Sequence, residues 1–294
     1  MREDNMLILF DFSQIVISSA IEYHSQTKEA IELPLLRHIS LNNILSYRKK
    51  FKAKIEEMII CCDGRDYWRK GVFPLYKQNR KKDHDKSAFN WDKFFEDFNQ
   101  IKTEIKTELP FNVVEVYGCE ADDVIAVLSK QQCPHQDRII IISSDKDLIQ
   151  IQENICPKVE QWSPFHKKNI SPKTNSYSLF EHVIRGDAGD GVPNILSDDD
   201  VFMDDSKRSK PIRATNIMQW EQNGGLGYPE RFCKSEEMLE RFNRNLNLID
   251  LRQIPECFVK KIVEEFSNFQ KPPANVFGYL TKHKLKKILE SGVL

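Results

Sequence analysis

The sequence predicts an α/β protein whose central sheet is mostly parallel and flanked by helices. Short apolar runs rich in β-branched residues are typical of buried strands, and the segments between them have the spacing of amphipathic helices. Strands that alternate with helices of this length form βαβ units, which build parallel sheets. We expect strands at 7–10, 58–62, 113–117 and 139–142, and a strand or edge hairpin at 161–168 followed by a turn at 171–174.

Helical spacing covers most of the remaining chain. The segments between the expected strands are 15–24, 35–58, 91–109 and 120–131. Beyond Ile195 the sequence turns acidic and then basic, and it continues with the helical segments 212–223, 235–251, 256–269 and 281–292. This change predicts an α/β core over 1–196 and a helical C-terminal region over 197–294.

The composition is that of an ordinary globular protein with a polar bias. The 294 residues are 40% hydrophobic and 30% charged. No apolar stretch approaches the roughly 20 residues that span a bilayer, and the N-terminus lacks the pattern of a signal peptide. The seven cysteines are scattered and odd in number, which favours reduced, structural thiols in a cytoplasmic protein.

Acidic residues follow the expected strands, precede an apolar helix or stand in a Gly-rich segment. Because the carboxyl ends of parallel strands share one rim of a sheet, we expect these carboxylates to converge there. One aspartate at a strand end is ordinary, but acids from four segments at one rim favour a bound Mg²⁺, which takes carboxylates, waters and phosphates as ligands. Asp123 is expected to be a helix-start acid only. The candidate ligands are Asp11, Asp63, Glu120, Asp122, Asp145, Asp147, Asp187 and Asp190.

The net charge of −1 conceals a basic segment. Between Arg65 and Lys86, eight Lys or Arg residues stand against three Asp residues, and aromatic side chains are interleaved with them. Such cations bind phosphates and such aromatics stack on unpaired bases, although a charged run is more often a solvated helix face. The Gly-rich segment 184–195 offers backbone N–H groups to phosphates, or is a plain turn. Together with the acidic rim, these features favour an enzyme that binds nucleic acid and cuts its backbone.

Several motifs resemble those of the structure-specific 5′-nucleases, the family that includes the flap endonucleases. The motifs are FDFSQI (10–15), YWR followed by YKQNR, EADDVIAVL (120–128), IISSDKD (141–147), QWSPFHKK, GDAGD, and RNLNLID with the following IP (244–255). They cover most of the chain in the family's order, and the similarity is greatest to its phage branch. The resemblance implies a PIN-like 5′-nuclease core, a helix-hairpin DNA-binding element and a helical C-terminal region.

The resemblance also implies roles for individual residues, including two bound Mg²⁺ ions for which Mn²⁺ can substitute. Five residues correspond to the ligands of the first ion: Asp11, Asp63, Glu120, Asp122 and Asp145. Three correspond to the ligands of the second, partly through water: Asp147, Asp187 and Asp190. Arg69 and Lys77 correspond to basic residues that contact the scissile phosphate and its developing charge, so they join Asp11, Asp63, Asp122 and Asp145 as catalytic residues.

Nucleic-acid contacts are expected from two further regions. Residues about 70–90 correspond to the arch under which a single-stranded 5′ end is threaded or clamped, and GDAGDGVPNI opens the helix-hairpin element that follows the duplex backbone. The G-x-G-x-K pattern of most relatives is missing, which leaves K⁺ binding undetermined and moves phosphate contact to later basic residues. The expected contact residues are Tyr67, Lys70, Arg80, Lys81, Lys82, Gly189, Gly191, Lys207, Arg208, Lys210 and Arg213.

These inferences predict a Mg²⁺-dependent 5′→3′ nuclease with a metal-activated water as nucleophile. Its expected substrates are RNA primers in RNA–DNA hybrids and the 5′ ends, flaps and forks of duplex DNA during phage lagging-strand replication. The expected protein partners are single-stranded-DNA-binding protein and the sliding clamp, and the expected form is a monomer in the host cytoplasm without membrane contact. Two alternatives stay open: a PIN-like endoribonuclease, and a non-catalytic protein that binds forked DNA.

Overall fold

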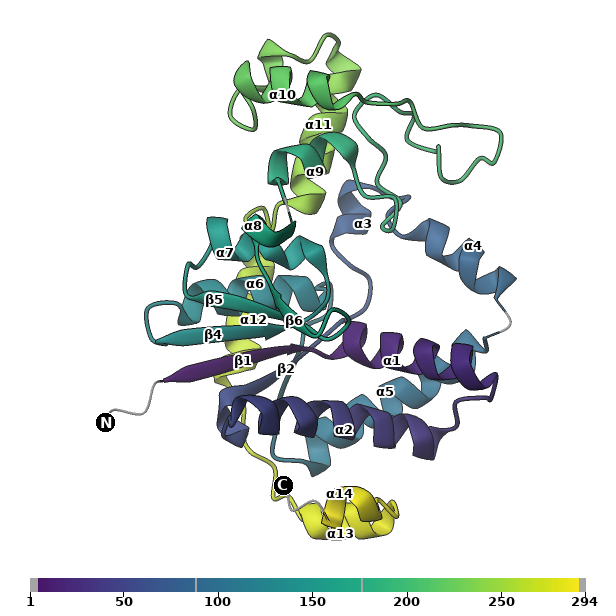
Figure 1. Ribbon diagram of the computed structural model, residues 1–294, viewed down its shortest axis with the longest axis vertical. Helices are drawn as coiled ribbons and strands as arrows, with labels where there is room; N and C mark the ends of the chain where they lie inside the picture. The colour runs from purple at the N-terminus through teal and green to yellow at the C-terminus, as the bar shows by residue number, and fades with distance from the viewer. Residues whose placement is uncertain (1–4, 88, 176, 291–294) are drawn as a thin grey trace. The chain divides into compact units, whose positions relative to one another are not determined.

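Six strands form one sheet in the order β3-β2-β1-β4-β5-β6 in the computed structural model (Figure 1). The pairs from β3 to β5 are parallel, and β6 pairs with β5 in the antiparallel direction. The predicted mostly parallel sheet is confirmed, and the segment at 161–168 is the edge hairpin of β5 and β6. The bounds are β1 (Met6–Asp11), β2 (Met58–Cys62), β3 (Asn112–Glu115), β4 (Arg138–Ile142), β5 (Val159–Ser163) and β6 (Lys168–Ile170).

The chain divides into two compact units. The structure describes all residues except 1–4, 88, 176 and 291–294. The first unit consists of Met1–Arg65, Phe89–Ser171 and Glu256–Leu294, and the second of Asp66–Ala88 and Pro172–Pro255. Each unit therefore contains segments from both sides of residue 196. The division into 1–196 and 197–294 stays a prediction.

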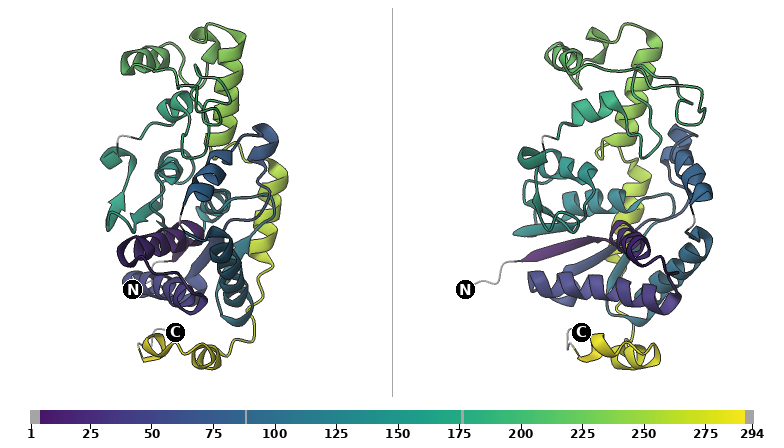
Figure 2. Two further views of the ribbon diagram at one scale, coloured as in Figure 1. Left: turned by 90° about the vertical axis from the view of Figure 1, so that its right-hand side faces the viewer. Right: turned by 45° about the vertical axis from the view of Figure 1, so that its right-hand side comes forward.

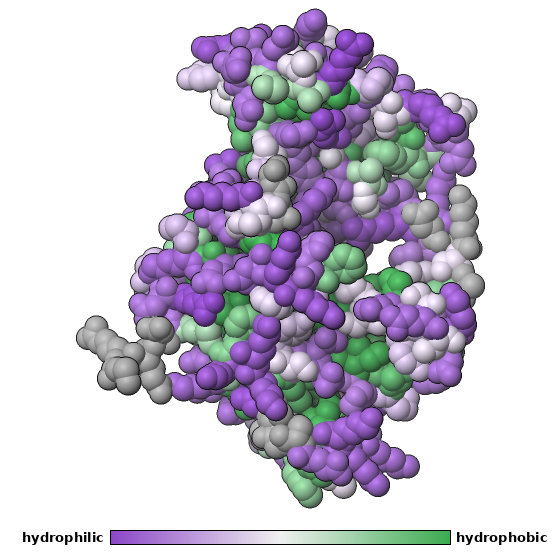
Figure 3. Space-filling view, in the orientation of Figure 1, coloured by the Kyte–Doolittle hydropathy of each residue, from purple (hydrophilic) through white to green (hydrophobic). Residues whose placement is uncertain are grey.

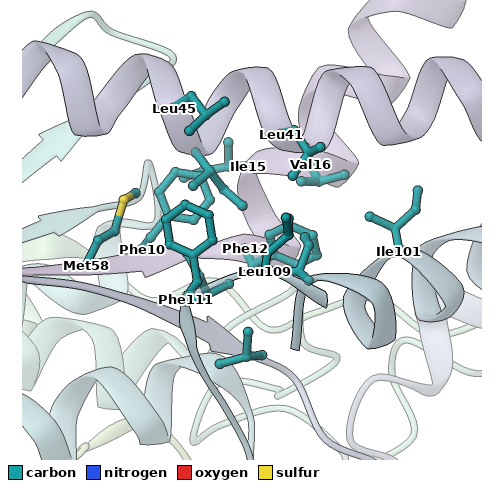
Figure 4. Packing of buried hydrophobic residues seen from close by; sticks show 14 of the residues in the cluster. Phe10, Phe12, Ile15, Val16, Leu41, Leu45, Met58, Ile101, Leu109 and Phe111 are labelled. Atoms are coloured by element: carbon teal, nitrogen blue, oxygen red, sulfur yellow. The ribbon is translucent and has the colours of Figure 1, made fainter. Parts of the chain in front are cut away.

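One face of the sheet packs against three long helices of the first unit. These helices are α1 (Phe12–Thr27), α2 (Leu33–Phe51) and α5 (Trp91–Glu108), and their buried side chains form one cluster with those of the strands. Figure 4 shows Phe10 and Met58 of the sheet close to Ile15 of α1 and Leu45 of α2. Such a core stabilises the fold because each buried aliphatic or aromatic side chain contributes about 1.5–3 kcal/mol.

The opposite face of the sheet is covered by α6 (Ala121–Gln132) and α12 (Glu256–Ser267), which contact each other and β3. Successive side chains of a strand point to opposite faces. Ile8 and Phe10 belong to the cluster on the first face, so Leu7, Leu9 and Asp11 point toward the face that α6 covers. The alternation thereby places the carboxylate of Asp11 on the same side of the sheet as the start of α6.

The expected end of one helix and one expected turn are wrong. The helix expected over 35–58 ends at Phe51, because Lys52 takes a left-handed conformation with φ 55°; a short 3₁₀ turn, η1 (Ile55–Glu57), follows and β2 begins at Met58. The expected turn at 171–174 is instead a short helix, α8 (Pro172–Asn175). Proline suits the first turn of a helix because its φ is already helical and its missing N–H has no partner there.

The prediction of one helix over 281–292 is also wrong. Lys284 has φ 56° and separates α13 (Val276–Lys282) from α14 (Lys286–Glu290), and residues 291 and 292 lie outside the described residues.

Both short helices lie next to α2 and α5 in the two views of Figure 2. Tyr279 of α13 donates a hydrogen bond of 2.7 Å to Glu104 of α5, which Arg37 of α2 also contacts through two hydrogen bonds. Burial raises the pKa of Glu104, but the hydrogen bonds from Arg37, Gln100 and Tyr279 outweigh burial and lower it to about 2.

The second unit is mainly helical around its own apolar core. Phe180, Val183, Phe232 and Phe242 are buried there, and Tyr76 packs with them. The helices expected over 212–223 and 235–251 are confirmed with shorter bounds. The helices of this unit are α3 (Arg69–Val72), α4 (Gln78–Lys86), α8, α9 (Leu179–Arg185), α10 (Ala214–Gln222), η3 (Pro229–Arg231) and α11 (Glu236–Ile249).

Hydrophilic side chains dominate the face of the molecule shown in Figure 3, and the apolar residues form separate areas between them. Among the helices of the described residues, none is both long and apolar enough to cross a bilayer.

A disulfide joins Cys133, at the end of α6, to Cys156, just after α7 (Gln150–Asn154). The expectation that all seven cysteines are reduced is therefore wrong for this pair, whereas the other five, all among the described residues, form no disulfide. The Cα atoms of the pair lie 5.9 Å apart, within the range that a disulfide requires. Scattered spacing gave no sign of this proximity, because the crossover between β4 and β5 brings the two residues together.

We expect Cys133→Ser to lower the free energy of unfolding of the oxidised protein by about 3 kcal/mol. A crosslink between residues 23 positions apart restricts the unfolded chain, and a loop of that size corresponds to about 3 kcal/mol. Urea unfolding measures the change, with Cys257→Ser, a free and exposed cysteine, as the control. Equal stability of the wild-type protein with and without reductant would contradict the disulfide.

Candidate active site

Asp11 lies at the end of the central strand β1, between β2 and β4. Its side chain is 3% exposed and caps α1 by accepting a hydrogen bond of 3.2 Å from the backbone N–H of Gln14. The other carboxylate oxygen accepts a hydrogen bond of 2.8 Å from the hydroxyl of Ser143, which follows β4. Both carboxylate oxygens are thus held by residues of neighbouring segments, which fixes the direction of the side chain.

Asp63 follows β2 directly and contacts the start of α6. One oxygen of its carboxylate accepts a hydrogen bond of 2.8 Å from the backbone N–H of Ala121. The next residue, Gly64, approaches a neighbouring loop so closely that a Cβ atom would lie 2.1 Å from the carbonyl oxygen of Val116. Since only glycine permits this approach, Gly64 helps to keep the end of β2 beside the start of α6.

Glu120 and Asp122 stand at the N-terminus of α6, where the helix dipole favours negative charge. Glu120 is buried and forms a capping box with Asp123, whose carboxylate accepts a hydrogen bond of 3.0 Å from the N–H of Glu120. Asp123 is thus a helix-start acid, as expected. Burial and the neighbouring Cys62 raise the pKa of the Cys61 thiol, and the charges of Asp11 and Asp122 add to this effect.

Asp145 caps the 3₁₀ helix η2 (Lys146–Ile149), where its carboxylate accepts a hydrogen bond of 2.9 Å from the N–H of Asp147. The N–H of Asp145 donates a hydrogen bond of 3.1 Å to the hydroxyl of Ser143. Gln161, fully buried on β5, donates hydrogen bonds to the carbonyl oxygens of Ser143 and Asp145, at 3.1 and 2.6 Å. The loop after β4 is therefore held from both sides, by β1 and by β5.

The electrostatics of Asp11 reflect the convergence of acids at this rim. Burial is the largest cause that raises the pKa of Asp11 to about 7, and the negative charges of Asp63 and Asp145 add to it. The hydrogen bonds from Ser143 and Gln14 act in the opposite direction. A carboxylate whose ionisation costs this much has a strong attraction for a cation.

The acids of the first unit fit a hard divalent cation. Asp11 and Glu120 are buried at this rim, and carboxylate oxygens are the ligands that hard divalent cations take. Mg²⁺ suits such a site because it keeps several waters and takes substrate phosphates as further ligands. Asp11, Asp63, Asp122 and Asp145 supply the oxygen donors that this chemistry requires.

Asp187 and Asp190 belong to the second unit, in the turn after α9. Asp187 pairs through its backbone with Val192, and its carboxylate lies 3.1 Å from the ring nitrogen Nε2 of His182. The other oxygen accepts a hydrogen bond of 3.1 Å from the N–H of Asp190. The GDAGDGV segment is thus a tight turn with oriented acids, and its predicted role at a second ion stays a prediction.

The basic residues of the arch also belong to the second unit. Arg69 is buried, donates a hydrogen bond of 2.9 Å to the carbonyl oxygen of Leu248 and lies over the ring of Trp68. Lys77 has φ 59° and its ammonium lies 3.6 Å from the carboxylate of Asp190. Their predicted contact with the scissile phosphate stays a prediction.

The remaining predicted contact residues lie on the second unit with different surroundings. Lys70, Arg80, Lys81, Arg208, Lys210 and Arg213 are exposed. Lys82 donates a hydrogen bond of 2.6 Å to the carbonyl oxygen of Met203, and Lys207 pairs with Asp200 at 2.5 Å. Tyr67 has the ammonium groups of Lys70 and Lys77 over its ring.

Sequence reasoning missed the residues that hold the site in place. Ser143 and Gln161 are uncharged, so a search for metal ligands passes over them, although a glutamine within a buried strand is itself a signal. Lys102 of α5 donates a hydrogen bond of 3.4 Å to the carbonyl oxygen of Asp63 and forms a 2.6 Å ion pair with Glu115. Arg241 and Arg244 of α11, which pair with Asp199, were also missed.

Comparisons with known proteins identify the family. Residues 15–177, more than half of the chain, match the N-terminal resolvase-like domain of 5′–3′ exonucleases, and residues 171–293 match the C-terminal domain of T4 RNase H. The chain belongs to the 5′–3′ exonuclease family of metal-dependent nucleases, as its motifs predicted. It is a structure-specific 5′–3′ nuclease by this membership.

Two relatives in sequence and one solved structure show how far the similarity extends along the chain. The ribonuclease H of Enterobacteria phage T4 is 32% identical over 292 residues, which cover 97% of this chain and 94% of the relative. A 5′–3′ exonuclease of Buchnera aphidicola is 32% identical over 159 residues, half of each chain. A bacteriophage T5 flap endonuclease, solved with DNA and metal ions, has the same fold with 19% identity and a TM-score of 0.65 over 90% of this chain and 100% of that one.

We expect Asp11→Asn to stabilise the metal-free protein at pH 8 but not at pH 5. The pKa of Asp11 is about 7 in the folded protein, against a usual 3.8. Between pH 3.8 and about pH 7, the carboxyl group is therefore ionised in the unfolded chain but still protonated in the folded chain. The free energy of unfolding of the wild type therefore falls as the pH rises through this window, by up to about 4 kcal/mol at about 1.4 kcal/mol per pKa unit.

Urea unfolding in the presence of EDTA, at pH 5 and pH 8, measures this difference. Glu153→Gln, at an exposed position of α7, is the control for general loss of negative charge. Parallel pH dependence of the wild type and Asp11→Asn would show that burial and the neighbouring acids do not perturb Asp11.

Proposed function

We propose that this chain is a Mg²⁺-dependent 5′→3′ nuclease that removes RNA primers from RNA–DNA hybrids and cuts 5′ flaps of duplex DNA during phage replication. The observation that carries the proposal is the linked set of acids at one rim of the sheet. Asp11, Asp63 and Asp145 stand at the ends of three adjacent parallel strands. Their carboxylates accept hydrogen bonds from the hydroxyl of Ser143 and from the N–H groups of Ala121 and Asp147, respectively. The T4 ribonuclease H, similar along almost its whole length, supports the substrate.

The proposed first ion is held by Asp11, Asp63, Asp122 and Asp145, with Glu120 directly or through water, and the proposed second ion by Asp147, Asp187 and Asp190. When bound, the ions supply an activated water and stabilise the leaving oxygen of a phosphodiester. Mn²⁺ is expected to replace Mg²⁺, because both take carboxylate and water ligands.

The chain's own residues contribute orientation and charge. Ser143 and Gln161 hold the acids in fixed directions, so little reorganisation is needed during the reaction. Arg69, Lys77 and the exposed cations Lys70, Arg80 and Lys81 bind substrate phosphates, and Tyr67 offers a ring for base stacking. Lys207, Arg208, Lys210 and Arg213, with the backbone at Gly189 and Gly191, follow the duplex.

The family resemblance also supports single-stranded-DNA-binding protein and the sliding clamp as partners. It further supports action as a monomer in the cytoplasm of the infected bacterium.

We expect Asp145→Asn to lower the cleavage rate by more than the roughly 10–100-fold that loss of an outer-shell partner of a metal costs. The substrates are a 5′-labelled flap duplex and an RNA–DNA hybrid, each with Mg²⁺. Asp92→Asn, an exposed residue of α5, is the matched control and should cleave like the wild type.

Three other results would redirect the proposal. Intact substrates with the wild type, despite binding to forks, would favour the non-catalytic DNA-binding alternative. Cleavage of unstructured RNA alone would favour the PIN-like endoribonuclease. Full activity of Asp145→Asn would show that the rim does not hold the catalytic metal.

A further inference from the structure

In the second unit, the base of the arch is fastened to the Gly-rich turn after α9. The turn contributes Ala188, Gly189 and Asp190, and the arch contributes the segment 76–80. Asn79 donates a hydrogen bond of 2.8 Å to the carbonyl oxygen of Ala188, and Arg80 donates one of 3.1 Å to that of Gly189. The two segments are more than one hundred residues apart in the chain, so these contacts fix the arch by tertiary structure alone.

Asp190 is the centre of this junction. Its carboxylate accepts a 2.5 Å hydrogen bond from the guanidinium of Arg80 and a 2.8 Å hydrogen bond from the hydroxyl of Tyr76. The ammonium of Lys77 lies 3.6 Å from the same carboxylate, and the backbone N–H of Lys77 donates 2.8 Å to the carbonyl oxygen of Asp190. One aspartate thus contacts three residues of the arch, Tyr76, Lys77 and Arg80, through four separate interactions.

Backbone geometry on both sides indicates that the junction is built for close contact. Lys77 has φ 59°, a left-handed conformation that a non-glycine residue adopts at some cost, and its N–H bond to Asp190 compensates for it. Gly191 has φ +69°, and a Cβ atom there would lie 2.9 Å from the side-chain oxygen of Asn79. A side chain at 191 would therefore displace the amide group of Asn79, and its strain at this positive φ would add to the cost.

We propose that Asp190 is a positioning residue that attaches the arch to the Gly-rich turn and holds Lys77 and Arg80 in place for substrate phosphates. We call its contacts with Tyr76, Lys77 and Arg80 the latch. An ionised carboxylate has about four acceptor sites. With Arg80, Tyr76 and Lys77 around its carboxylate, Asp190 acts on the reaction through these side chains, and of the three acids proposed for the second ion it is the one that reaches the ion only through water. The role of the cations rests on the proposed function, whereas the latch itself does not.

The latch is tested by amide hydrogen exchange of residues 78–82 in the metal-free protein without DNA. Asp190→Asn removes the charge that attracts Arg80 and Lys77, so we expect exchange at these amides to accelerate about tenfold or more, as loss of charge-assisted hydrogen bonds implies. Asp198→Asn is the matched control, because Asp198 is an ion-paired acid of the same unit whose partners are Lys207, Lys210 and Arg241. If Asp190→Asn does not fold, Tyr76→Phe replaces it in this test, because it removes only the hydroxyl that donates to Asp190 and should accelerate exchange by a smaller factor.

A double-mutant cycle separates the latch from a metal role. If Asp190 acts through Arg80, then Asp190→Asn and Arg80→Ala together should accelerate exchange by much less than the product of their separate effects. Isothermal titration with Mg²⁺ should give the wild-type affinity for Asp190→Asn. In single-turnover cleavage of a 5′ flap, the variant should lose rate at saturating substrate more than it loses binding.

Two results would overturn the inference: wild-type exchange in Asp190→Asn, or multiplicative effects in the cycle. Loss of Mg²⁺ affinity together with unchanged exchange would make Asp190 a metal ligand instead. Because exchange is measured without substrate, absence of nuclease activity in the wild type would reject the proposed function and leave the latch standing.

Discussion

The hydroxyl of Ser143 joins two neighbouring parts of the acidic rim, the end of β1 and the loop after β4. It donates to the carboxylate of Asp11 and accepts from the N–H of Asp145, so the ends of β1 and β4 share one buried oxygen. Acids on adjacent strand ends repel each other, and only neutral donors can fix them without cancelling the charge that attracts a cation. Gln161 holds the same loop through the carbonyl oxygens of Ser143 and Asp145, and the hydrogen bond from Ser143 offsets part of the rise in the pKa of Asp11 that burial and the neighbouring acids cause.

Two kinds of acid in this chain differ in their surroundings. At the rim of the first unit, burial and then the negative charges of Asp63 and Asp145 raise the pKa of Asp11. In the second unit, Asp190, Asp199 and Asp200 pair with Lys or Arg side chains at distances of a hydrogen bond or ion pair. Aspartate therefore serves as a carboxylate without a cationic partner at the rim and as a counterion of Lys or Arg in the second unit. The net charge of the chain reveals neither arrangement.

The strand pattern predicted the sheet and the placement of Asp11 because apolar runs and their polar ends are local features of the sequence. The hydrogen-bond partners could not be predicted in this way, since Ser143 touches Asp11 only through the pairing of strands distant in the chain. The predicted helix ends were wrong where Lys52 and Lys284 take left-handed conformations, because no glycine or proline at these positions signals the end of a helix. The pairing of Cys133 also depends on tertiary structure alone.

The last strand of the sheet has a consequence for the behaviour of the protein in concentrated solution. β6 is only three residues long, runs against its neighbour and exposes Lys168 and Asn169. A long, flat, uncharged edge would present unpaired N–H and C=O groups as a template for a strand from another molecule. The short hairpin with its lysine gives such a strand little length to pair with and a charge to bury, so this edge resists intermolecular sheet formation and aggregation.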